Sequence, residues 1–403
     1  DVTKPGVLYI TYGYPWPLNS GMRLRDYHLI RAVSSRFAVS LLSLMERPEE
    51  AQHLEALHPY CASVDAVLAE RRSKTHRVVG LTGCVLRNRP VQTHMLGYPA
   101  MSAKVREIAE KQDVRIAQIE HSYMAHFAEA LPPGHQCRTI LDFQDVGFVQ
   151  YRRMLGLRGS LVRKARYVLE WWSANRWEIR YAQRFDQCVA VSPDDAQALR
   201  RASPDLAVAV VDNGVDTDAL RPLPEAPGSR DLLFVGTMSY MPNIDAVLYF
   251  ARCILPLIQR RIPGTRLVVV GKSPPESIRR LASRSDVVVT GSVPDVQPYY
   301  AASAVSVVPL RAGSGTRLKI LEAMALGRPV VSTPVGSEGL EVVDGQHLLL
   351  ADEPEAFADR VVALLEDSAL CADITARARS LVEERYSWPV LGERLMAVYD
   401  GLL

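Results

Sequence analysis

The sequence predicts an α/β protein built from two Rossmann-like, doubly wound domains. Short apolar runs alternate with amphipathic helical stretches through most of the chain, which is the pattern of βαβ units around parallel sheets. The alternation stops around residues 205–227, where prolines gather, and then starts again. Strands expected in the second half end in Gly, Pro or a small polar residue, and open α/β sheets bind ligands at such strand ends. The second half is therefore the expected nucleotide-binding domain.

The first domain is expected over residues 1–211. A loop rich in Pro and Gly follows its first strand, and a helix is expected from about Met22 to Ser34. Ser192 and Pro193 are residue types that begin a helix, and they follow another expected strand. The strands are expected at Val7–Tyr12, Phe37–Leu44, Val114–Ile119, Thr139–Leu141, Gln187–Val191 and Val208–Val211.

A linker is expected over residues 212–230. Its segment Arg221–Gly228 holds three prolines, which is typical of an extended connector. The second domain is expected over residues 231–385, with a helix beginning near Asn243. Its strands are expected at Leu232–Val235, Leu267–Val270, Val287–Thr290, Val305–Pro309 and Val330–Thr333.

The bulk composition is that of an ordinary soluble protein and points to no particular partner. The 403 residues carry a formal net charge of +2. No stretch approaches the roughly 18–20 apolar residues that span a bilayer, and the N-terminus lacks the features of a signal peptide. The cysteines show no zinc or redox spacing, so a reduced, cytoplasmic protein is expected. They are Cys61, Cys84, Cys137, Cys188, Cys253 and Cys371.

The most informative segment is Arg311–Val330. It follows a strand and leads into a helix expected from about Thr316 to Leu326. Glycines allow a close backbone approach, and the first N–H groups of a helix point outward, so this junction suits a diphosphate. The junction consists of Gly313, Ser314, Gly315 and Thr316.

Charged side chains follow in the same helix. Arg317 and Lys319 lie in its first turn, where a cation opposes the helix dipole, so the pair is expected to bind an external anion. Simple solvation is the alternative for either residue. Glu322 is expected to accept hydrogen bonds from ribose hydroxyls, and a surface pair with Arg328 is the alternative.

Several segments resemble glycosyltransferase family 4, a large family of retaining enzymes with the GT-B fold. Gly315–Glu322 and the following Ala323–Val331 look like its donor-site signature. Leu233–Ala246 resembles the start of its donor domain, Val289–Asp295 its base-reading loop, and Asn213–Asp216 the turn before its interdomain linker. The matches follow the order of the family. They are most similar to the bacterial exopolysaccharide subgroup, which includes the sugar transferases of PEP-CTERM systems.

The resemblance implies a retaining glycosyltransferase whose two domains face each other across a cleft. The implied donor is a nucleotide-diphosphate sugar (UDP-, GDP- or other), and the implied acceptor is a glycan, a lipid-linked sugar or a small molecule. The mechanism commonly proposed for the family needs no protein nucleophile, no metal and no other cofactor, because the leaving diphosphate takes the acceptor proton. Trp388–Pro389 is the implied crossing point into a last helix, about 386–403, which completes the acceptor-binding first domain.

The resemblance also implies donor contacts, and the chain departs from the family at several of them. The family carries a Glu at the position of Ser314, and an Arg and a Lys at about the positions of Thr237 and Asn243. We expect Arg317 and Lys319 to supply the missing positive charge to the diphosphate and to act as catalytic residues. The expected donor contacts are Gly236, Thr237, Asn243, Gly271, Gly291, Val293, Gly313, Ser314, Gly315, Thr316 and Glu322.

Five residues of the first domain are further candidates. His121 follows a strand where many family members carry a histidine near the donor sugar, so it is a candidate catalytic residue or a structural one. Gly21 and Arg25 begin the first helix and are candidates for contact with the acceptor or a phosphate, or form a plain helix start. Asp142 and Asp145 follow a strand and are candidates for the acceptor side, or for capping the next helix.

The segment 151–184 combines nine basic residues with Trp171, Trp172 and Trp177. A basic, aromatic helical region can lie on an anionic membrane surface, which would suit a polyprenyl-diphosphate-linked acceptor. The alternative is a domain helix with its tryptophans in the core. Nucleic-acid binding is not expected, because no recognised module accompanies the charge.

Two functions from different classes remain open on the sequence alone. The first is a hexosyl-type glycosyltransferase of polysaccharide or glycoconjugate biosynthesis. The second is a non-catalytic GT-B domain that serves as a binding or assembly subunit, which Ser314 and the missing basic pair favour.

Overall fold

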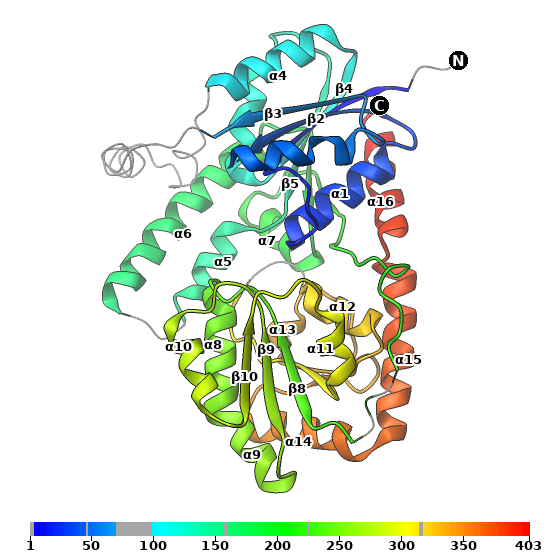
Figure 1. The fold of residues 1–403 in the computed structure, drawn as a ribbon. Helices are drawn as coiled ribbons and strands as arrows, with labels where there is room; N and C mark the ends of the chain where they lie inside the picture. Colours follow the sequence, from blue (N-terminus) through cyan, green and yellow to red (C-terminus); the bar gives the residue numbers. More distant parts are fainter. Residues whose placement is uncertain are drawn as a thin grey trace. The chain divides into compact units, whose positions relative to one another are not determined.

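The computed structural model describes residues 4–45, 47–69, 99–156, 160–224, 226, 228–313 and 317–403. They form two compact units, each with its own parallel sheet (Figure 1). The first unit consists of residues 1–155, 159–213 and 388–403, and the second contains residues 214–387. The predicted fold class, α/β with two Rossmann-like domains, is confirmed.

The described part of the first unit contains a sheet of seven parallel strands in the order β3-β2-β1-β4-β5-β6-β7. The order reverses between β1 and β4, which makes this pair the topological switch point of the sheet. Val7 and Tyr9 face α1 (Gly21–Val33) and α16 (Trp388–Asp400). Leu8 and Ile10 face α4 (Pro99–Lys111) and η2 (Ser122–Ala130), so both faces of the sheet are covered. The strands are β1 (Gly6–Tyr12), β2 (Ala38–Met45), β3 (Ser63–Leu68), β4 (Val114–Glu120), β5 (Arg138–Phe143), β6 (Gln187–Ala190) and β7 (Val208–Val210).

Some helices of the first unit begin at serines that cap them. Ser20 and Ser192 accept hydrogen bonds at the starts of α1 and α7. The last helix, α16, packs on α1: Trp388 stacks on His28 with ring centroids 4.9 Å apart. The described helices are α1 (Gly21–Val33), η1 (Pro48–Leu57), α4 (Pro99–Lys111), η2 (Ser122–Ala130), α5 (Gly147–Met154), α6 (Leu161–Ala182), α7 (Pro193–Ala202) and α16 (Trp388–Asp400).

The second unit repeats the same topology. Its described residues form six parallel strands in the order β10-β9-β8-β11-β12-β13, with the switch point between β8 and β11. Runs rich in Val and Leu, such as Leu267–Val270, are buried because helices cover both faces. The strands are β8 (Asp231–Val235), β9 (Arg266–Val270), β10 (Val287–Gly291), β11 (Val305–Val308), β12 (Val330–Ser332) and β13 (Leu349–Leu350).

The helices of the second unit include one long run that is unusually apolar. Met241–Arg261 is long and apolar enough to cross a membrane by composition alone, which the sequence prediction had not allowed for. Half of its most apolar window is buried, and Val247, Phe250 and Ile254 pack in the core, which is typical of a core helix. The described helices are α8 (Met241–Tyr249), η3 (Phe250–Ile254), α9 (Leu255–Arg261), α10 (Glu276–Arg279), η4 (Arg280–Ser283), α11 (Gln297–Ala302), α12 (Leu318–Ala325), α13 (Pro334–Ser337), α14 (Pro354–Glu366) and α15 (Ser368–Arg385).

The segment between the two sheets is held on the second unit. The Val215 backbone N–H donates to the Tyr386 carbonyl at 2.9 Å, and the Leu223 N–H donates to the Leu326 carbonyl at 3.0 Å. The Arg379 guanidinium donates to the Thr217 carbonyl at 2.9 Å. These bonds fix the Pro-rich segment on α12 and α15 instead of leaving it free.

Candidate functional site

The carboxyl edge of the second sheet is lined by glycines. Gly236 follows β8, Gly271 follows β9, and Gly291 ends β10. A Cβ atom on Gly271 would lie 1.7 Å from the Gly236 carbonyl oxygen, so only glycine fits there. The Gly271 N–H donates to the Gly291 carbonyl at 3.0 Å, and the Gly236 N–H to the Val270 carbonyl at 2.9 Å. The three strand ends therefore form one close-packed backbone ridge beside the switch point.

Lys319 reaches this ridge from the first turn of α12. Its Nζ would lie only 2.9 Å from a Cβ atom on Gly236, so the ammonium group occupies the space that a side chain would fill. Its Nζ also donates to the Asn243 side-chain oxygen at 2.8 Å and lies 4.2 Å from the centre of the Phe234 ring. This contact with an aromatic face adds cation–π attraction. The cation is held at the switch point of the sheet.

Asn243 and Thr237 link this cation to the start of α8. The Asn243 side-chain amide donates to the Thr237 carbonyl at 2.9 Å, while its oxygen accepts from Lys319. Asn243 is buried, so its orientation is fixed by these two bonds. The structure thus places the Lys319 ammonium beside the two positions at which the resembling family carries its basic pair.

Arg317 provides a second cation near the ridge. It is the residue that immediately precedes α12, and its side chain is buried. A Cβ atom on Gly313 would lie 2.7 Å from one of its terminal nitrogens, so the guanidinium packs against the bare Gly313 backbone. Two cations therefore flank the end of β11.

The protonation of Lys319 and Glu322 is finely balanced. Burial lowers the pKa of Lys319 to about 7; the charge of Arg317 lowers it further, and that of Glu322 acts the other way. Burial raises the pKa of Glu322 to about 7, with Lys319 opposing that rise. An incoming anion would favour the protonated lysine.

The alternative pairing of Glu322 with Arg328 is not seen, because Arg328 is buried and donates to the carbonyls of Tyr300, Pro224 and Ala301.

The other expected donor contacts lie around this edge or outside the described residues. Val293 follows β10 and is half-buried against the core of the second unit. Ser314, Gly315 and Thr316 are not among the described residues.

Sequence reasoning missed one anchor of the segment after β11. Arg311 forms a two-bonded ion pair with Asp245 of α8, at 2.9 and 2.6 Å, and its guanidinium lies 4.3 Å from the centre of the Tyr249 ring. The pair fixes the start of the Gly313 loop. No sequence signal marks it, because Asp245 and Arg311 are 66 residues apart.

At the switch point of the first sheet, His121 follows β4 with a positive φ of 68°. A non-glycine residue in this region is strained, and such strain is common at functional sites. Burial lowers the pKa of His121 to about 3, with the charge of Arg25 as a further cause, so the ring is neutral at pH 7. Its ring stacks on that of Tyr123, with centroids 4.8 Å apart. Among the described residues, its Nε2 atom has no hydrogen-bond partner.

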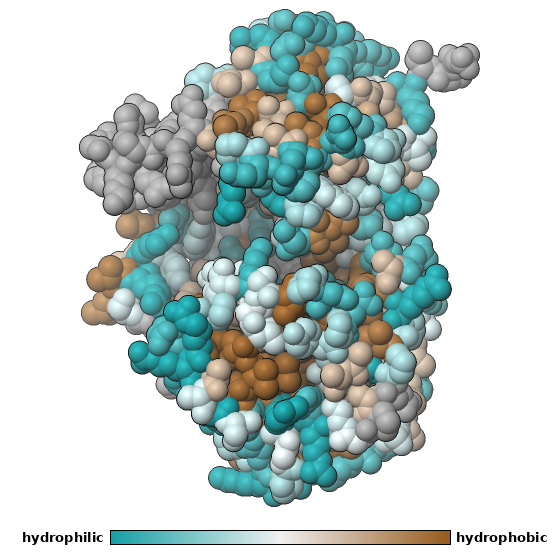
Figure 2. All heavy atoms as spheres, viewed as in Figure 1, coloured by the Kyte–Doolittle hydropathy of each residue, from teal (hydrophilic) through white to brown (hydrophobic). Residues whose placement is uncertain are grey.

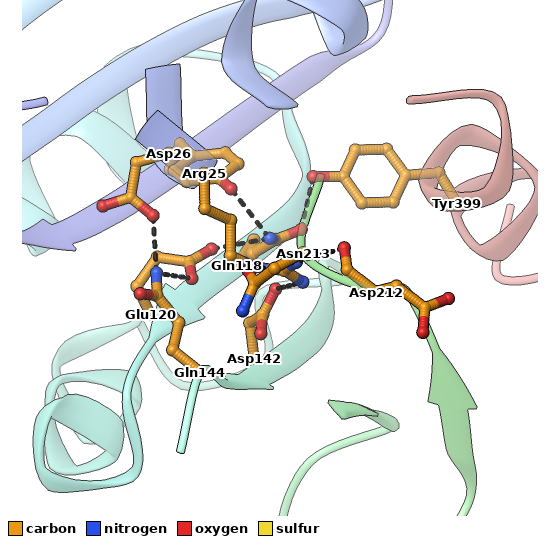
Figure 3. Close-up of polar contacts among 10 residues, drawn as sticks. Arg25, Asp26, Gln118, Glu120, Asp142, Gln144, Asp212, Asn213 and Tyr399 are labelled. Carbon is orange, nitrogen blue, oxygen red and sulfur yellow. Dashed lines mark hydrogen bonds and ion pairs between the residues drawn. The ribbon is translucent and has the colours of Figure 1, made fainter. Parts of the chain in front are cut away.

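A buried polar network, shown in Figure 3, adjoins His121, whose backbone N–H donates to the Asp142 carbonyl at 2.9 Å. Arg25 and Asp142 form an ion pair at 2.7 Å with almost no exposed side-chain surface. Arg25 also donates to the Asp212 carbonyl at 2.8 Å and to the Asn213 side chain at 3.2 Å. Arg25 and Asp142 are buried and bonded to each other and to neighbouring protein groups, which places them to position those groups.

Two further carboxyl groups share this interior. The Gln144 amide donates to Asp26 at 2.6 Å and to Glu120 at 2.8 Å. Burial, followed by repulsion from neighbouring carboxylates, raises the pKa of Asp26 and raises that of Glu120 to about 8. At neutral pH the network therefore retains a proton on at least one of these two groups.

The network extends to the last helix of the chain. The Tyr399 hydroxyl donates to the Gln118 side-chain oxygen at 2.6 Å, and the Gln118 amide donates to Glu120 at 2.7 Å and to the Tyr9 hydroxyl at 3.1 Å (Figure 3). Arg394 of α16 pairs with Asp212 at 2.7 Å. Hydrogen bonds and an ion pair thus connect the buried network at the first sheet's switch point to α16.

The remaining two candidates of the first unit lie nearer the surface. Gly21 is the first residue of α1 and is partly exposed. Asp145 is exposed in the segment between β5 and α5, whereas Asp142 three residues earlier is buried. Glu178 carries out the capping once expected of these aspartates, because its carboxylate accepts from the N–H groups of Gly147 and Phe148 at 3.0 and 3.2 Å.

A cavity of about 540 Å³ lies elsewhere in the second unit, at the opposite edge of the sheet. Its lining arginines already have protein partners: Arg261 pairs with Asp359, and Arg230 and Arg328 donate to carbonyls. Open α/β sheets bind ligands at the carboxyl edge of their strands. We therefore assign the candidate site to the Gly236–Lys319 edge and not to this cavity.

Two Rossmann-like units, each built on a parallel sheet of this topology, are the architecture of the GT-B class of folds. The solved structure of HepE from Anabaena in complex with UDP-glucose superposes with a TM-score of 0.67, covering 98% of this chain and 99% of that one at 15% identity. Residues 229–367 match the family described as Glycosyl transferases group 1.

Two curated relatives extend the comparison. Phosphatidyl-myo-inositol mannosyltransferase of Mycobacterium tuberculosis is 29% identical over 204 residues, which is 47% of this chain and 53% of that protein. The chain thus spans about half the length of this relative. The lipopolysaccharide core biosynthesis mannosyltransferase LpsB of Rhizobium meliloti is 23% identical over 81% of this chain and 95% of its own length.

Proposed function

We propose that this chain is a retaining glycosyltransferase that uses a nucleotide-diphosphate sugar. Its acceptor would be a glycan, a lipid-linked sugar or a small molecule of bacterial polysaccharide or glycoconjugate biosynthesis. The match of residues 229–367 to Glycosyl transferases group 1 and the two mannosyltransferase relatives support this proposal. The resemblance to family 4 and to its exopolysaccharide and PEP-CTERM subgroup supports retention of configuration.

One observation carries the proposal: the Lys319 ammonium lies against the bare backbone of Gly236, at the switch point between β8 and β11. Open α/β sheets bind nucleotides at this place, and glycine lets a diphosphate approach the backbone closely. A lysine whose pKa is lowered to about 7 by burial gains its full charge when an anion arrives. The arrangement fits a diphosphate better than it fits a neutral ligand.

In the proposed reaction the bond between the anomeric carbon and the diphosphate oxygen breaks, and the diphosphate keeps the electron pair. The acceptor oxygen bonds to the same face of the anomeric carbon, and its proton passes to the departing phosphate. Lys319 and Arg317 would stabilise the charge that develops on the diphosphate. We propose that these cations serve where other transferases use a metal ion, so that chelation by EDTA leaves turnover unchanged.

The remaining roles follow the resemblance. Glu322 would accept hydrogen bonds from the ribose hydroxyls, and Val293 would contact the base. Asn243 would hold Lys319 in place through the bond to its side-chain oxygen. His121 would help to organise the reaction as a neutral group, because burial lowers its pKa to about 3. We also propose a cytoplasmic location, where nucleotide sugars are made.

The decisive experiment incubates the chain with UDP-, GDP-, TDP- and ADP-sugars and measures nucleotide release with and without oligosaccharide or lipid-linked acceptors. Release with one nucleotide, together with retention of the anomeric configuration by NMR, is the expected result. Donor binding by calorimetry without release under any condition would instead support the non-catalytic binding subunit. Neither binding nor release would remove the nucleotide-sugar proposal altogether.

A further inference from the structure

Helix α6 has two halves with different environments. In its C-terminal half Ala174, Trp177 and Tyr181 are buried in the core of the first unit. In its N-terminal half, residues 161–169 are exposed except for the partly buried Tyr167. The helix therefore extends beyond the core that anchors it.

Helix α6 carries most of the large exposed apolar side chains in the described chain. Nine such side chains are found among the described residues, and five of them lie on α6. Leu161 and Val162 are 86% and 81% exposed, which is extreme for aliphatic residues. Figure 2 shows hydrophobic residues at the free end of α6, at the left of the view. The five are Leu161, Val162, Val168, Leu169 and Trp172.

These side chains share one face of the helix. At 3.6 residues per turn, Leu161, Val168, Leu169 and Trp172 lie on one stripe, and Val162 lies at its edge. The buried residues Glu170, Ala174, Trp177 and Tyr181 form the opposite stripe. The exposed apolar face therefore points away from the protein to which α6 is anchored, so the core of the first unit does not cover it.

Basic side chains flank the apolar face. By helical geometry Lys164 lies on one side of the stripe and Arg166 on the other, and both are exposed. Arg176 lies over the Trp172 ring at 5.2 Å. Exposed Arg163 adds a further positive charge, and Glu170 is the only acidic residue of this half, where its side chain is nearly buried.

The anchoring of α6 is rigid. The Glu178 carboxylate accepts from the Ser122 hydroxyl at 2.7 Å and from two N–H groups at the start of α5. The Trp177 indole N–H donates to the Ser122 carbonyl at 2.9 Å. These contacts join α5, α6 and η2, so the exposed face is presented by a fixed element.

From this arrangement we propose that the exposed half of α6 inserts into the interfacial layer of an anionic lipid bilayer. A helix with an apolar face flanked by Lys and Arg lies in the plane of the interface, with its apolar side chains among the acyl chains and its cations at the lipid headgroups. The positive flanks favour an anionic membrane over an apolar protein partner, for which they would be unnecessary. The inference is independent of the proposed transferase activity.

Vesicle sedimentation tests the proposal with the full chain. We expect binding to vesicles of phosphatidylcholine and phosphatidylglycerol at about two to one, little binding to phosphatidylcholine alone, and release at high salt.

The apolar variant L161S/L169S should weaken partition at least about tenfold. The charge variant K164Q/R166Q should weaken it about 25-fold, at about fivefold per charge. Trp172 fluorescence should shift to the blue on binding, and W172F should lose that shift.

Matched variants at exposed sites of the second unit serve as controls. V288S/V343S removes exposed apolar residues, and R279Q/R280Q removes two exposed cations, Arg279 of α10 and Arg280 of η4. Neither should change partition, and all variants should keep the wild-type unfolding midpoint. Failure of the wild type to bind either vesicle would overturn the proposal, as would binding that the α6 variants leave intact. So would a wild-type dimer, seen in sedimentation equilibrium without vesicle binding, that L161S/L169S dissociates.

Discussion

The two sheets have the same strand order but use their switch points in opposite ways. In the second unit the edge is bare backbone, with the Lys319 ammonium against Gly236 and a pKa poised near 7. In the first unit the corresponding edge covers a sealed ion pair between Arg25 and Asp142. The sheet topology therefore fixes where a binding site can form. The side chains at each switch point decide whether it can bind a ligand or only holds neighbouring residues in position.

The largest expected effect is on the buried Arg25–Asp142 pair of the first unit. Arg25→Ala leaves Asp142 buried without its partner, so the free energy of unfolding should fall by about 3–5 kcal/mol in urea titrations. The double variant R25A/D142A should recover part of that loss, because no uncompensated charge remains. The exposed pair of Arg36 and Asp400 is the control, and R36A should cost at most about 1 kcal/mol. An R25A loss no larger than that of R36A would contradict a sealed network.

The next effect is on the open side. Lys319→Ala should lower the kcat of the proposed transfer reaction about 100- to 1000-fold, because a preorganised cation that meets developing charge is lost. Lys272→Ala removes an exposed lysine just after β9 and should change kcat by less than about twofold. Both variants should unfold at the wild-type midpoint. Retention of most activity by K319A would remove Lys319 from the proposed mechanism.

The residues at the strand edge of the second unit could largely be predicted from the sequence, but the contacts between their side chains could not. Glycines at strand ends and cations in the first turn of α12 are local patterns, so Gly236, Gly271 and Lys319 were predicted near one site. The bond from Lys319 to Asn243 joins residues 76 positions apart and depends on side-chain reach across the sheet edge, which no local pattern encodes. The sequence pointed instead to a loss of charge at position 243.

The first unit was harder to predict for a related reason. The sequence shows that Arg25 lies near a helix start and that Asp142 follows a strand, but not that other elements cover both. The network around them also includes α16, whose Tyr399 donates to Gln118 from the far end of the chain. The edge strand β3 was missed because its residues are half-buried, or exposed at Leu68, and lack the continuous apolar run of the central strands.

A third effect is the pH dependence of stability that the buried network of the first unit should cause. Burial raises the pKa of Glu120 to about 8, so the folded state binds this proton more tightly than the unfolded chain does. Its stabilisation is fully present below the unfolded pKa of about 4.3 and is lost as the pH rises through about 8. Glu120→Gln cannot ionise and should reduce that loss by on the order of 1–2 kcal/mol, because neighbouring carboxyls share the proton.

Urea midpoints between pH 5 and pH 9 measure the effect of E120Q. The Gln118 amide can flip to accept from the new side chain, because the Tyr9 and Tyr399 hydroxyls can each donate or accept. A residual slope from Glu178 is expected, since burial raises its pKa to about 7 as well. Exposed Glu107, whose pKa is lowered by hydrogen bonds from Lys111 and Lys104, is the control: E107Q should not flatten the slope. An E120Q profile parallel to the wild type would contradict the raised pKa.

The smallest expected effect would test how neighbouring residues set the pKa of Lys319 in the second unit. Lys319 is protonated below its pKa of about 7, so kcat/KM should fall as the pH rises through that value in the free enzyme. Asn243→Asp puts a carboxylate 2.8 Å from the ammonium, which favours the charged lysine and should move this alkaline limb upward by about one pH unit. Asn243→Ala removes the same hydrogen bond without adding charge, so it should lower kcat/KM without the upward shift. Glu322 must be ionised to accept hydrogen bonds from the ribose hydroxyls, so its pKa of about 7 should add an acidic limb to the profile. E322Q should abolish this acidic limb and leave the alkaline limb in place. If N243D and N243A shifted the limb equally, the tuning would come from packing around Lys319 and not from the charge beside it.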